Sequence, residues 1–533
     1  MDGENNNIMY QVSFMPSGRQ VEVAAGVSLI KAAHLAGVHI NASCGGSGVC
    51  GKCRVILESG TLEGGKSEKL TDAEYKEGYR QACLATVATN ATIRVTAESE
   101  LGAGSMSTEV PIRHQARMHV FNIDALKKEG VFAPPIEKRV LHLPEPTQED
   151  NKADAGRIIQ GLKKEYDERG MITTLPLLKK MRSALRENDF VVTVTLSRAV
   201  SKDGKTHIVN IEPGDVSHRN YGLAFDIGTT TVHGILIDHQ TGKLLSRKSD
   251  YNAQISYGED VISRIIHAEK PKGLQLMHEL VINTINGLIT KLLLKTDIRR
   301  NEIFSITLSG NTTMTHLLLS LEPHNIRRAP YVPVSTFFPP IRARDVGLEL
   351  PLRAVALVYP SISSYVGGDI VAGVMGSGMY RTEKLTLYVD IGTNAEIVIG
   401  NRDWLVCAAC SAGPAFEGGG ITHGMRAAAG AIEDFSLNPA TYEPMNITIG
   451  NVRPKGICGS GLIIIAATMF EMGVIDNRGK FNRDLNTSRI RETNGIYEYV
   501  LVWKQETQID RDITLTEPDL DNLIRAKGAI YSG

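Results

Sequence analysis

Neither sign of charge dominates this sequence, and no stretch of it is apolar enough for a membrane. The 533 residues include 58 Lys and Arg against 59 Asp and Glu, a formal net charge of −1. This balance creates no long-range field for a polyanion, so we expect neither nucleic acid nor an anionic membrane surface as a partner. The most apolar stretch, around 461–470, is far shorter than the ~20 residues that a spanning helix needs.

The sequence also lacks a secretory signal and a disulfide pattern. It begins MDGENNNIMY, without the basic start and apolar core of a signal peptide. The cysteines number seven, and four of them lie between positions 44 and 83, which favours a metal site in a reducing compartment. With 42% hydrophobic residues, the length suits about three packed domains. We therefore expect a folded, multidomain, cytoplasmic protein.

The clustered cysteines form the pattern Cys44-x5-Cys50-x2-Cys53, followed at a distance by Cys83. Three thiolates on one loop with a distant fourth is the ligand layout of a plant-type [2Fe–2S] cluster, although the plant-type first spacing is four residues. The glycines between them allow the backbone to wrap closely and aim N–H groups at the sulfurs. A structural zinc site is the alternative. Zinc sites usually pair their ligands as two C-x2-C knuckles, and only Cys50 and Cys53 form one here.

The other three cysteines are Cys407, Cys410 and Cys458. The first two form a C-x-x-C in an apolar segment. Free cysteine behaves as a small buried hydrophobe, so we expect all three to pack in cores and assign them no function.

The pattern along the chain predicts four parts. Residues 1–100 are β-rich, and 101–125 form a linker with no sustained period. Residues 126–215 form a small α+β middle domain with two strands around an Asp203-Gly204 turn, and no motif there indicates chemistry. From 220 to 533 strands alternate with helices, as in an α/β domain.

The sequence D-I-G-T occurs at 226–229 and again at 390–393, each time between two β-rich apolar stretches. Each is therefore a turn between strands, which excludes a P-loop, whose motif leads into a helix and carries a lysine. Tight glycine turns with exposed N–H groups suit phosphate, and Asp226 and Asp390 can hold Mg²⁺ through water. The predicted phosphate contacts are Gly228, Thr229, Thr230, Thr231, Gly392, Thr393 and Asn394.

Two strand-to-helix turns fit the same kind of site. They contain Ser309, Gly310, Asn311 and Thr312 in the first, and Gly459, Ser460 and Gly461 in the second. Helix N-termini bind anions, but these residue types also serve as plain caps. In the segment 366–370, Asp369 is a candidate base or metal-side carboxylate, or equally a helix N-cap.

The paired hairpins resemble those of the sugar kinase, heat-shock chaperone and actin superfamily of ATPases, in which two such hairpins hold ATP phosphates across an interdomain cleft. This resemblance implies a duplicated actin-like (ribonuclease H-like) ATPase domain at 220–533. A ferredoxin-type cluster passes single electrons at about −400 mV. ATP is needed only if an electron must move uphill, at about 2.3 kcal/mol per 100 mV.

The whole arrangement resembles the reductive activators of corrinoid proteins. The motifs that carry this likeness are CGGSGVCGKC, RQAC, DIGTTT, LSGNTTMTH, YVGGDI, DIGTNAE, GPAFEGGGI and GICGSGL. It implies that a β-grasp ferredoxin-like domain holds a [2Fe–2S] cluster through Cys44, Cys50, Cys53 and Cys83, and that the hairpins bind ATP with Mg²⁺. The family reduces the Co(II) of a corrinoid protein in a methyltransferase system to Co(I), using an external electron donor. It also continues beyond LIRAKGAIYSG into a strand and a turn that contact adenosine, so we expect a truncated chain.

Three alternatives stay open. The first is an activator of another low-potential enzyme, of the radical dehydratase type, against which the N-terminal cysteine loop argues. The second is a small-molecule kinase with a redox-sensing ferredoxin domain, and the third is a non-enzymatic module that changes shape with ATP. The sequence also leaves open the identity of the electron donor and whether the protein forms a homodimer.

Overall fold

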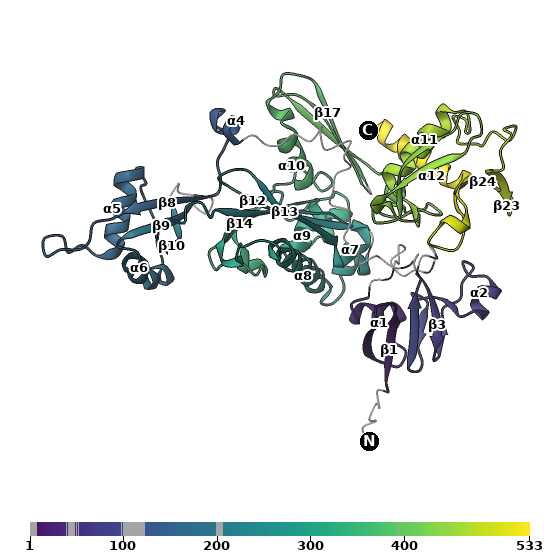
Figure 1. Cartoon of the computed structure of the whole chain (residues 1–533), viewed down its shortest axis with the longest axis horizontal. Coiled ribbons are helices and arrows are strands. Elements are labelled where there is room, and N and C mark those ends of the chain that lie inside the picture. The colour runs from purple at the N-terminus through teal and green to yellow at the C-terminus, as the bar shows by residue number, and fades with distance from the viewer. Residues whose placement is uncertain are drawn as a thin grey trace. The chain divides into compact units, whose positions relative to one another are not determined.

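The computed structural model describes residues 8–38, 40, 48, 51, 53–96, 99, 123–198, 206–258, 260–392 and 394–533. The chain divides into two compact units (Figure 1). The first comprises Met1–Glu109, Ile255–Arg264 and Gly378–Gly533, and the second comprises Val110–Gln254 and Ile265–Ser377. Among the described helices, none has the length and apolarity needed to cross a membrane.

The N-terminal part of the first unit contains a five-stranded sheet in the order β2-β1-β7-β3-β5. Strand β1 alternates along its length, so that Val12 and Phe14 are fully buried. Strand β1 pairs antiparallel with β2 and parallel with β7. This combination of a β1-β2 hairpin, a helix and a parallel closing strand confirms the expected β-grasp fold. The elements are β1 Met9–Met15, β2 Arg19–Ala24, α1 Leu29–Leu35, β3 Arg54–Ser59, β4 Leu62–Gly64, α2 Asp72–Lys76, β5 Tyr79–Gln81, β6 Ala85–Val87 and β7 Ala91–Val95.

The middle domain is an antiparallel sheet, β10-β9-β8, with helices α5 and α6 packed on it. The strands β9 and β10 pair as expected, while the Asp203-Gly204 turn lies outside the described residues. Helix α6, which was not predicted from the sequence, buries Leu177, Met181 and Leu185. The elements are α4 Ile123–Lys128, β8 Ile136–His142, α5 Asp154–Tyr166, α6 Leu175–Glu187, β9 Val191–Ser197 and β10 His207–Pro213.

The rest of the second unit is a six-stranded sheet in the order β13-β12-β11-β14-β16-β15. Strand β11 is central, antiparallel to β12 and parallel to β14. Helix α8 packs against β12 and β13, and α10 packs against β14. The elements are β11 Tyr221–Ile227, β12 Thr231–Asp238, β13 Leu244–Tyr251, α7 Val261–Ala268, α8 Gly273–Leu293, β14 Ile303–Gly310, α9 Thr312–Leu318, β15 Ile341–Arg342, β16 Val355–Val358 and α10 Gly368–Ser377.

The C-terminal part contains a hairpin, β17-β18, that corresponds to the hairpin β11-β12. The strands of this part form three small sheets, β17-β18-β19, β21-β20-β22 and β23-β24-β25. Among the described strands, β17 pairs only with β18, whereas its counterpart β11 lies between β12 and β14. The elements are β17 Thr386–Ile391, β18 Ala395–Gly400, β19 Leu405–Cys410, β20 Ala431–Leu437, β21 Pro444–Thr448, β22 Gly456–Ile457, α11 Gly459–Glu471, β23 Ile490–Thr493, β24 Ile496–Val502, β25 Ile513–Thr516 and α12 Glu517–Ser532.

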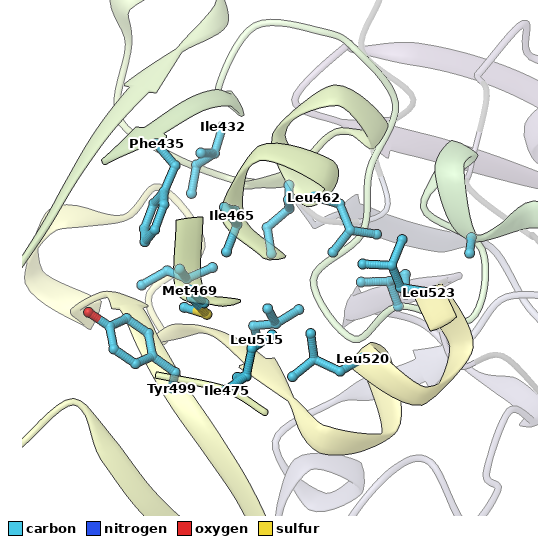
Figure 2. Close-up of a cluster of buried hydrophobic side chains, with 14 of the residues drawn as sticks. Ile432, Phe435, Leu462, Ile465, Met469, Ile475, Tyr499, Leu515, Leu520 and Leu523 are labelled. Carbon is cyan, nitrogen blue, oxygen red and sulfur yellow. The ribbon is translucent and has the colours of Figure 1, made fainter. Parts of the chain in front are cut away.

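One apolar cluster joins β20, β24, β25, α11 and α12 (Figure 2). Helix α11 contributes Ile465 and Met469, and β25 contributes Leu515, all of them fully buried. Helix α12 is fixed at its start by a capping box, in which Thr516 and Asp519 bond each other's backbone N–H groups. The cluster therefore positions α11, whose N-terminus carries one of the predicted phosphate turns.

Candidate functional site

The β-grasp domain brings Cys53 and Cys83 together from distant points in the chain. Cys53 directly precedes β3, and Cys83 lies between β5 and β6. Their Sγ atoms are 3.2 Å apart, well beyond the roughly 2.05 Å of a disulfide, so the two cysteines are adjacent but not bonded to each other as a disulfide. Cys44 and Cys50 lie outside the described residues.

The loop beside these thiols has the backbone that the glycines predict. Gly48 and Gly51 adopt φ of 82° and 71°, the left-handed region that glycine tolerates. A Cβ on Gly51 would come within 2.9 Å of Lys69 Cβ. The buried Gln81 donates from Nε2 to the Gly48 carbonyl at 3.4 Å, which ties the loop to the strand that precedes Cys83. Two adjacent thiols beside a glycine loop fit an iron–sulfur ligand set. The described residues contain no cluster of three or more His, Cys, Asp or Glu that suits a metal.

The first D-I-G-T forms a tight hairpin between β11 and β12, as predicted. The N–H of Gly228 donates to the Thr231 carbonyl at 2.9 Å, and a Cβ on Gly228 would lie 2.7 Å from that oxygen. The glycine is therefore required by the turn. The sequence predicted an exposed N–H at Gly228. This prediction is wrong, because that N–H already donates a hydrogen bond within the hairpin.

The buried Asn252 holds this hairpin from behind. Its Nδ2 donates to the Gly228 carbonyl at 2.9 Å, and its N–H donates to the Thr230 carbonyl at 2.9 Å. The exposed Asp226 is the residue that precedes the turn by two positions. In the sheet register, Asp226 lies opposite His233 and Ser309.

The strand-to-helix turn at 309–312 meets the hairpin directly. Asn311 is the N-cap of α9, because its Oδ1 accepts the Met314 N–H at 2.9 Å. Its Nδ2 donates to the Thr229 hydroxyl at 3.0 Å. Asn311 is therefore a helix cap, and it also joins this turn to the first hairpin; anion binding by the turn stays a prediction. Gly310 is needed for close packing, since its Cβ would lie 2.7 Å from the Ile227 carbonyl oxygen.

A third loop closes on the same point. A Cβ on Gly367 would lie 2.4 Å from the Asn311 Cα and 2.7 Å from the Asp369 Oδ1. The side chain of Asp369 accepts the Ile370 N–H at 2.9 Å at the start of α10. The hydroxyl of Thr312 donates to the Ser363 carbonyl at 2.6 Å. The second unit therefore gathers the hairpin, the 309–312 turn and Asp369 in one place.

The second D-I-G-T also forms a hairpin, between β17 and β18, and Thr393 within it lies outside the described residues. Here too the glycine N–H is occupied, because Gly392 donates to the Asn394 carbonyl at 2.8 Å. Asp390 is half-buried, and this burial raises the pKa of its carboxyl group. The Oε1 of Glu417 approaches a Cβ position on Gly392 at 3.8 Å.

The glycines at the start of α11 have a packing role. A Cβ on Gly459 would lie 1.9 Å from the Phe416 carbonyl oxygen, and one on Gly461 would lie 2.0 Å from that of Ile432. The Ser460 hydroxyl contacts the Cys458 Sγ at 3.2 Å. The short helix Pro414–Glu417 thus lies against both the α11 start and, through Glu417, the second hairpin.

One cysteine expectation is wrong. Cys410 and Cys458 are buried as predicted, but Cys407 is exposed. Cys407 and Cys410 stand three positions apart on the strand β19, and side chains at that spacing point to opposite faces. The C-x-x-C is therefore split between the core and the surface.

Two contributors were missed from the sequence. Asn252 holds the first turn from a distant strand end, and no local motif marks it. Glu417 lies within the motif GPAFEGGGI. Its negative charge beside two glycine-rich turns is the sequence feature that could have identified it.

Four family profiles match the chain in order. They are described as a 2Fe-2S iron-sulfur cluster binding domain at residues 13–88, the RACo linker region at 125–218, the RACo middle region at 221–382, and the C-terminal ASKHA domain of RACo at 384–533. A ferredoxin-type domain and an actin-like ATPase domain are thereby confirmed. The first supports a [2Fe–2S] cluster and the second supports ATP binding.

Named relatives agree with these profiles. A corrinoid activation enzyme, RamQ, of Eubacterium limosum is 36% identical over 323 residues, 59% of this chain and 54% of that protein. A reductase of the Co(II) methylated amine-specific corrinoid protein of Methanosarcina barkeri is 28% identical over 40% of each chain. The match therefore spans about half the length of these curated relatives, or less.

A solved structure matches almost the entire chain. It is titled as a reductive activator for corrinoid, iron-sulfur protein, and it is 39% identical, with a TM-score of 0.69, over 98% of this chain and 82% of that one. Because the likeness extends through the β-grasp domain, the middle domain and both D-I-G-T hairpins, the chain belongs to the family of reductive activators of corrinoid proteins.

Proposed function

We propose that this protein uses ATP to restore a corrinoid protein of a methyltransferase system, by one-electron reduction of its Co(II) to Co(I). The observation that carries the proposal is that one chain contains both an adjacent cysteine pair in a 2Fe-2S domain and the D-I-G-T hairpins of an ASKHA domain. The names of two relatives, one a corrinoid activation enzyme and one a reductase of a Co(II) corrinoid protein, support it.

The four cysteines Cys44, Cys50, Cys53 and Cys83 would hold the [2Fe–2S] cluster. When bound, that group supplies single-electron transfer at low potential. The chain's own contribution is to keep the thiols close, 3.2 Å apart for Cys53 and Cys83, and to fix the neighbouring loop through Gln81. An external donor provides the electrons.

Each hairpin would present one carboxylate and several hydroxyl or amide groups to the phosphates of ATP. Asp226 and Asp390 would hold Mg²⁺ through water, as hard oxygen ligands do. Asn311, which already bonds Thr229, would align the first hairpin with the start of α9. Asp369 and Asn311 both lie next to Gly367, and Asp369 is the candidate to orient water. We place the protein in the cytoplasm, where its cysteines stay reduced.

The deciding experiment combines metal analysis with a reduction assay. Anaerobically purified protein should contain two irons with matching sulfide and show a [2Fe–2S] EPR signal after reduction with dithionite. With ATP and a Co(II) corrinoid protein, Co(I) absorbance should then appear. Zinc in place of iron would overturn the reductase function, and a cluster without ATP-dependent Co(I) would overturn the corrinoid assignment.

Two variants test the hairpins separately. Asp226→Ala and Asp390→Ala should each lower ATP hydrolysis without bleaching the cluster. Asp403→Ala is the matched control, since Asp403 is an exposed aspartate in the turn at the other end of β18. Unchanged hydrolysis in both hairpin variants would remove the D-I-G-T turns from the mechanism.

A further inference from the structure

A pocket of about 270 Å³ lies in the second unit, and no residue of the first D-I-G-T hairpin lines it. One wall comes from α6 and β10 of the middle domain, and includes Lys180 and Asn210. The other comes from the segments that precede β14 and β16, and includes Arg299, Asn301 and Arg353. The pocket therefore lies at the seam between the middle domain and the six-stranded sheet.

Two carboxylates also line the pocket, and each is already paired with a cation outside it. Glu302 accepts two hydrogen bonds from Arg219, at 2.5 and 3.0 Å, and Glu212 accepts one from Lys138 at 2.9 Å. Burial alone would raise the pKa of Glu302, but the Arg219 hydrogen bonds hold it at about 2. Glu302 also lies 3.6 Å from the Nε of Arg299, so Arg299 shares a carboxylate, whereas Lys180 and Arg353 have no carboxylate partner among the described residues.

Two of those cations have neutral partners among the described residues. Lys180 donates from Nζ to the Asn210 Oδ1 at 2.8 Å. Arg353 donates to the Thr174 hydroxyl, and its buried Nε has no hydrogen-bond partner. Burial, with the nearby positive charge of Arg342, lowers the pKa of Arg353. A half-buried guanidinium with an unbonded Nε and no carboxylate partner among the described residues costs free energy unless an anion joins it.

We propose that this pocket binds a small oxyanion carrying two or more negative charges, through Arg353 and Lys180, with Arg299 at its rim. The planar fork of arginine suits a phosphoryl or carboxylate group, and the lysine adds a point charge. A volume of about 270 Å³ accommodates a phosphate ester or a compact polycarboxylate but excludes a polymer. Because the two cations belong to opposite walls, the anion would fasten the middle domain to the six-stranded sheet.

The test measures binding of inorganic phosphate and of citrate to the full chain by isothermal titration calorimetry. The arms separate a phosphoryl ligand from a polycarboxylate. Lys180→Gln and Arg353→Gln should each weaken the anion that binds by 10-fold or more. Lys179→Gln is the matched control, because Lys179 is exposed on the same helix and does not line the pocket.

The outcomes separate clearly. Phosphate held by the hairpins would bind equally well to Lys180→Gln and Arg353→Gln, so binding that persists in both overturns the proposal. Absence of binding by either anion at 10 mM also overturns it. Since Arg353→Gln removes the Thr174 contact as well, Lys180→Gln keeps the test valid if the arginine variant is unstable. Thermal unfolding without anion identifies such a case.

Discussion

The substitution Asn311→Asp separates the structural role of Asn311 from its proposed role at the phosphates. The Asn311 Oδ1 caps α9 by accepting the Met314 N–H at 2.9 Å, and aspartate caps equally well. On the other side, Nδ2 donates to the Thr229 hydroxyl at 3.0 Å. That hydroxyl can rotate and donate to an aspartate oxygen instead, so the link between the two loops survives.

The expected magnitudes differ between stability and binding. A negative charge at a helix N-terminus adds about 0.3–1 kcal/mol, so Asn311→Asp should be as stable as the parent protein or slightly more so. The same charge about 5 Å from a phosphate, at an effective dielectric constant of about 20, costs roughly 3 kcal/mol, or about two decades in affinity. Asn311→Ala should behave differently, losing about 1 kcal/mol of stability with the cap.

The assay pairs nucleotide titration with denaturation of the same preparations. Calorimetry gives the dissociation constant for an ATP analogue, and hydrogen exchange in α9 gives the local stability. We expect weak binding with intact α9 protection for Asn311→Asp, and weakened protection for Asn311→Ala. If Asn311→Asp binds the nucleotide as tightly as the parent protein, Asn311 is a helix cap alone and the phosphate site lies elsewhere.

Three further predictions address the cluster and the cores. Cys53→Ser should abolish the visible absorbance and EPR signal of the cluster while leaving nucleotide affinity unchanged; retained absorbance would refute the ligand assignment. Leu515→Ala, at a fully buried position, should cost about 2–5 kcal/mol in the exchange-derived stability of β24 and β25, and a cost below about 1 kcal/mol would contradict the packing. Burial lowers the pKa of His239 to about 4, so its stabilising contribution is complete above pH 6.5 and is lost as the pH falls towards 4. Hydrogen exchange of β11 and β12 should show a loss of about 2 kcal/mol between pH 7 and pH 5, which His239→Gln removes.

The local features of this fold were readable from the sequence. The β-rich composition of residues 1–100 matches the strands found there, and apolar stretches on both sides of each D-I-G-T predicted hairpins rather than helix starts. Both depend on residues within a few positions of one another. The cysteine pattern differs, because it indicated a contact between residues 30 positions apart, and Cys53 and Cys83 do meet.

Contacts across long stretches of chain were not readable. Nothing near Asn252 indicates that its amide would hold Gly228, because that contact depends on the pairing of β12 with β13. The apolar residues around Cys407 suggested that it would be buried. Side chains alternate between the two faces of β19, however, and Cys407 lies on the face opposite the buried Cys410, so it is exposed. The glycines of GICGSGL looked like anion-binding residues, and the closeness of the Phe416 and Ile432 carbonyls supplies a packing reason for two of them.

The two hairpins show what a sequence repeat does and does not determine. Both copies occupy the glycine N–H within the turn, so the repeat sets the backbone. The surroundings differ: the first turn is held by the buried Asn252 and needs its glycine at 2.7 Å from a carbonyl oxygen, whereas the second leaves 3.6 Å at the same position. Burial also raises the pKa of Asp390, while Asp226 is exposed. Since both glycine N–H groups are occupied, a phosphate would be held by the other groups of each turn and by the neighbouring turns, and the surroundings of the two turns differ. The repeated motif therefore sets the same turn twice but places its two aspartates in different environments, one half-buried and one exposed.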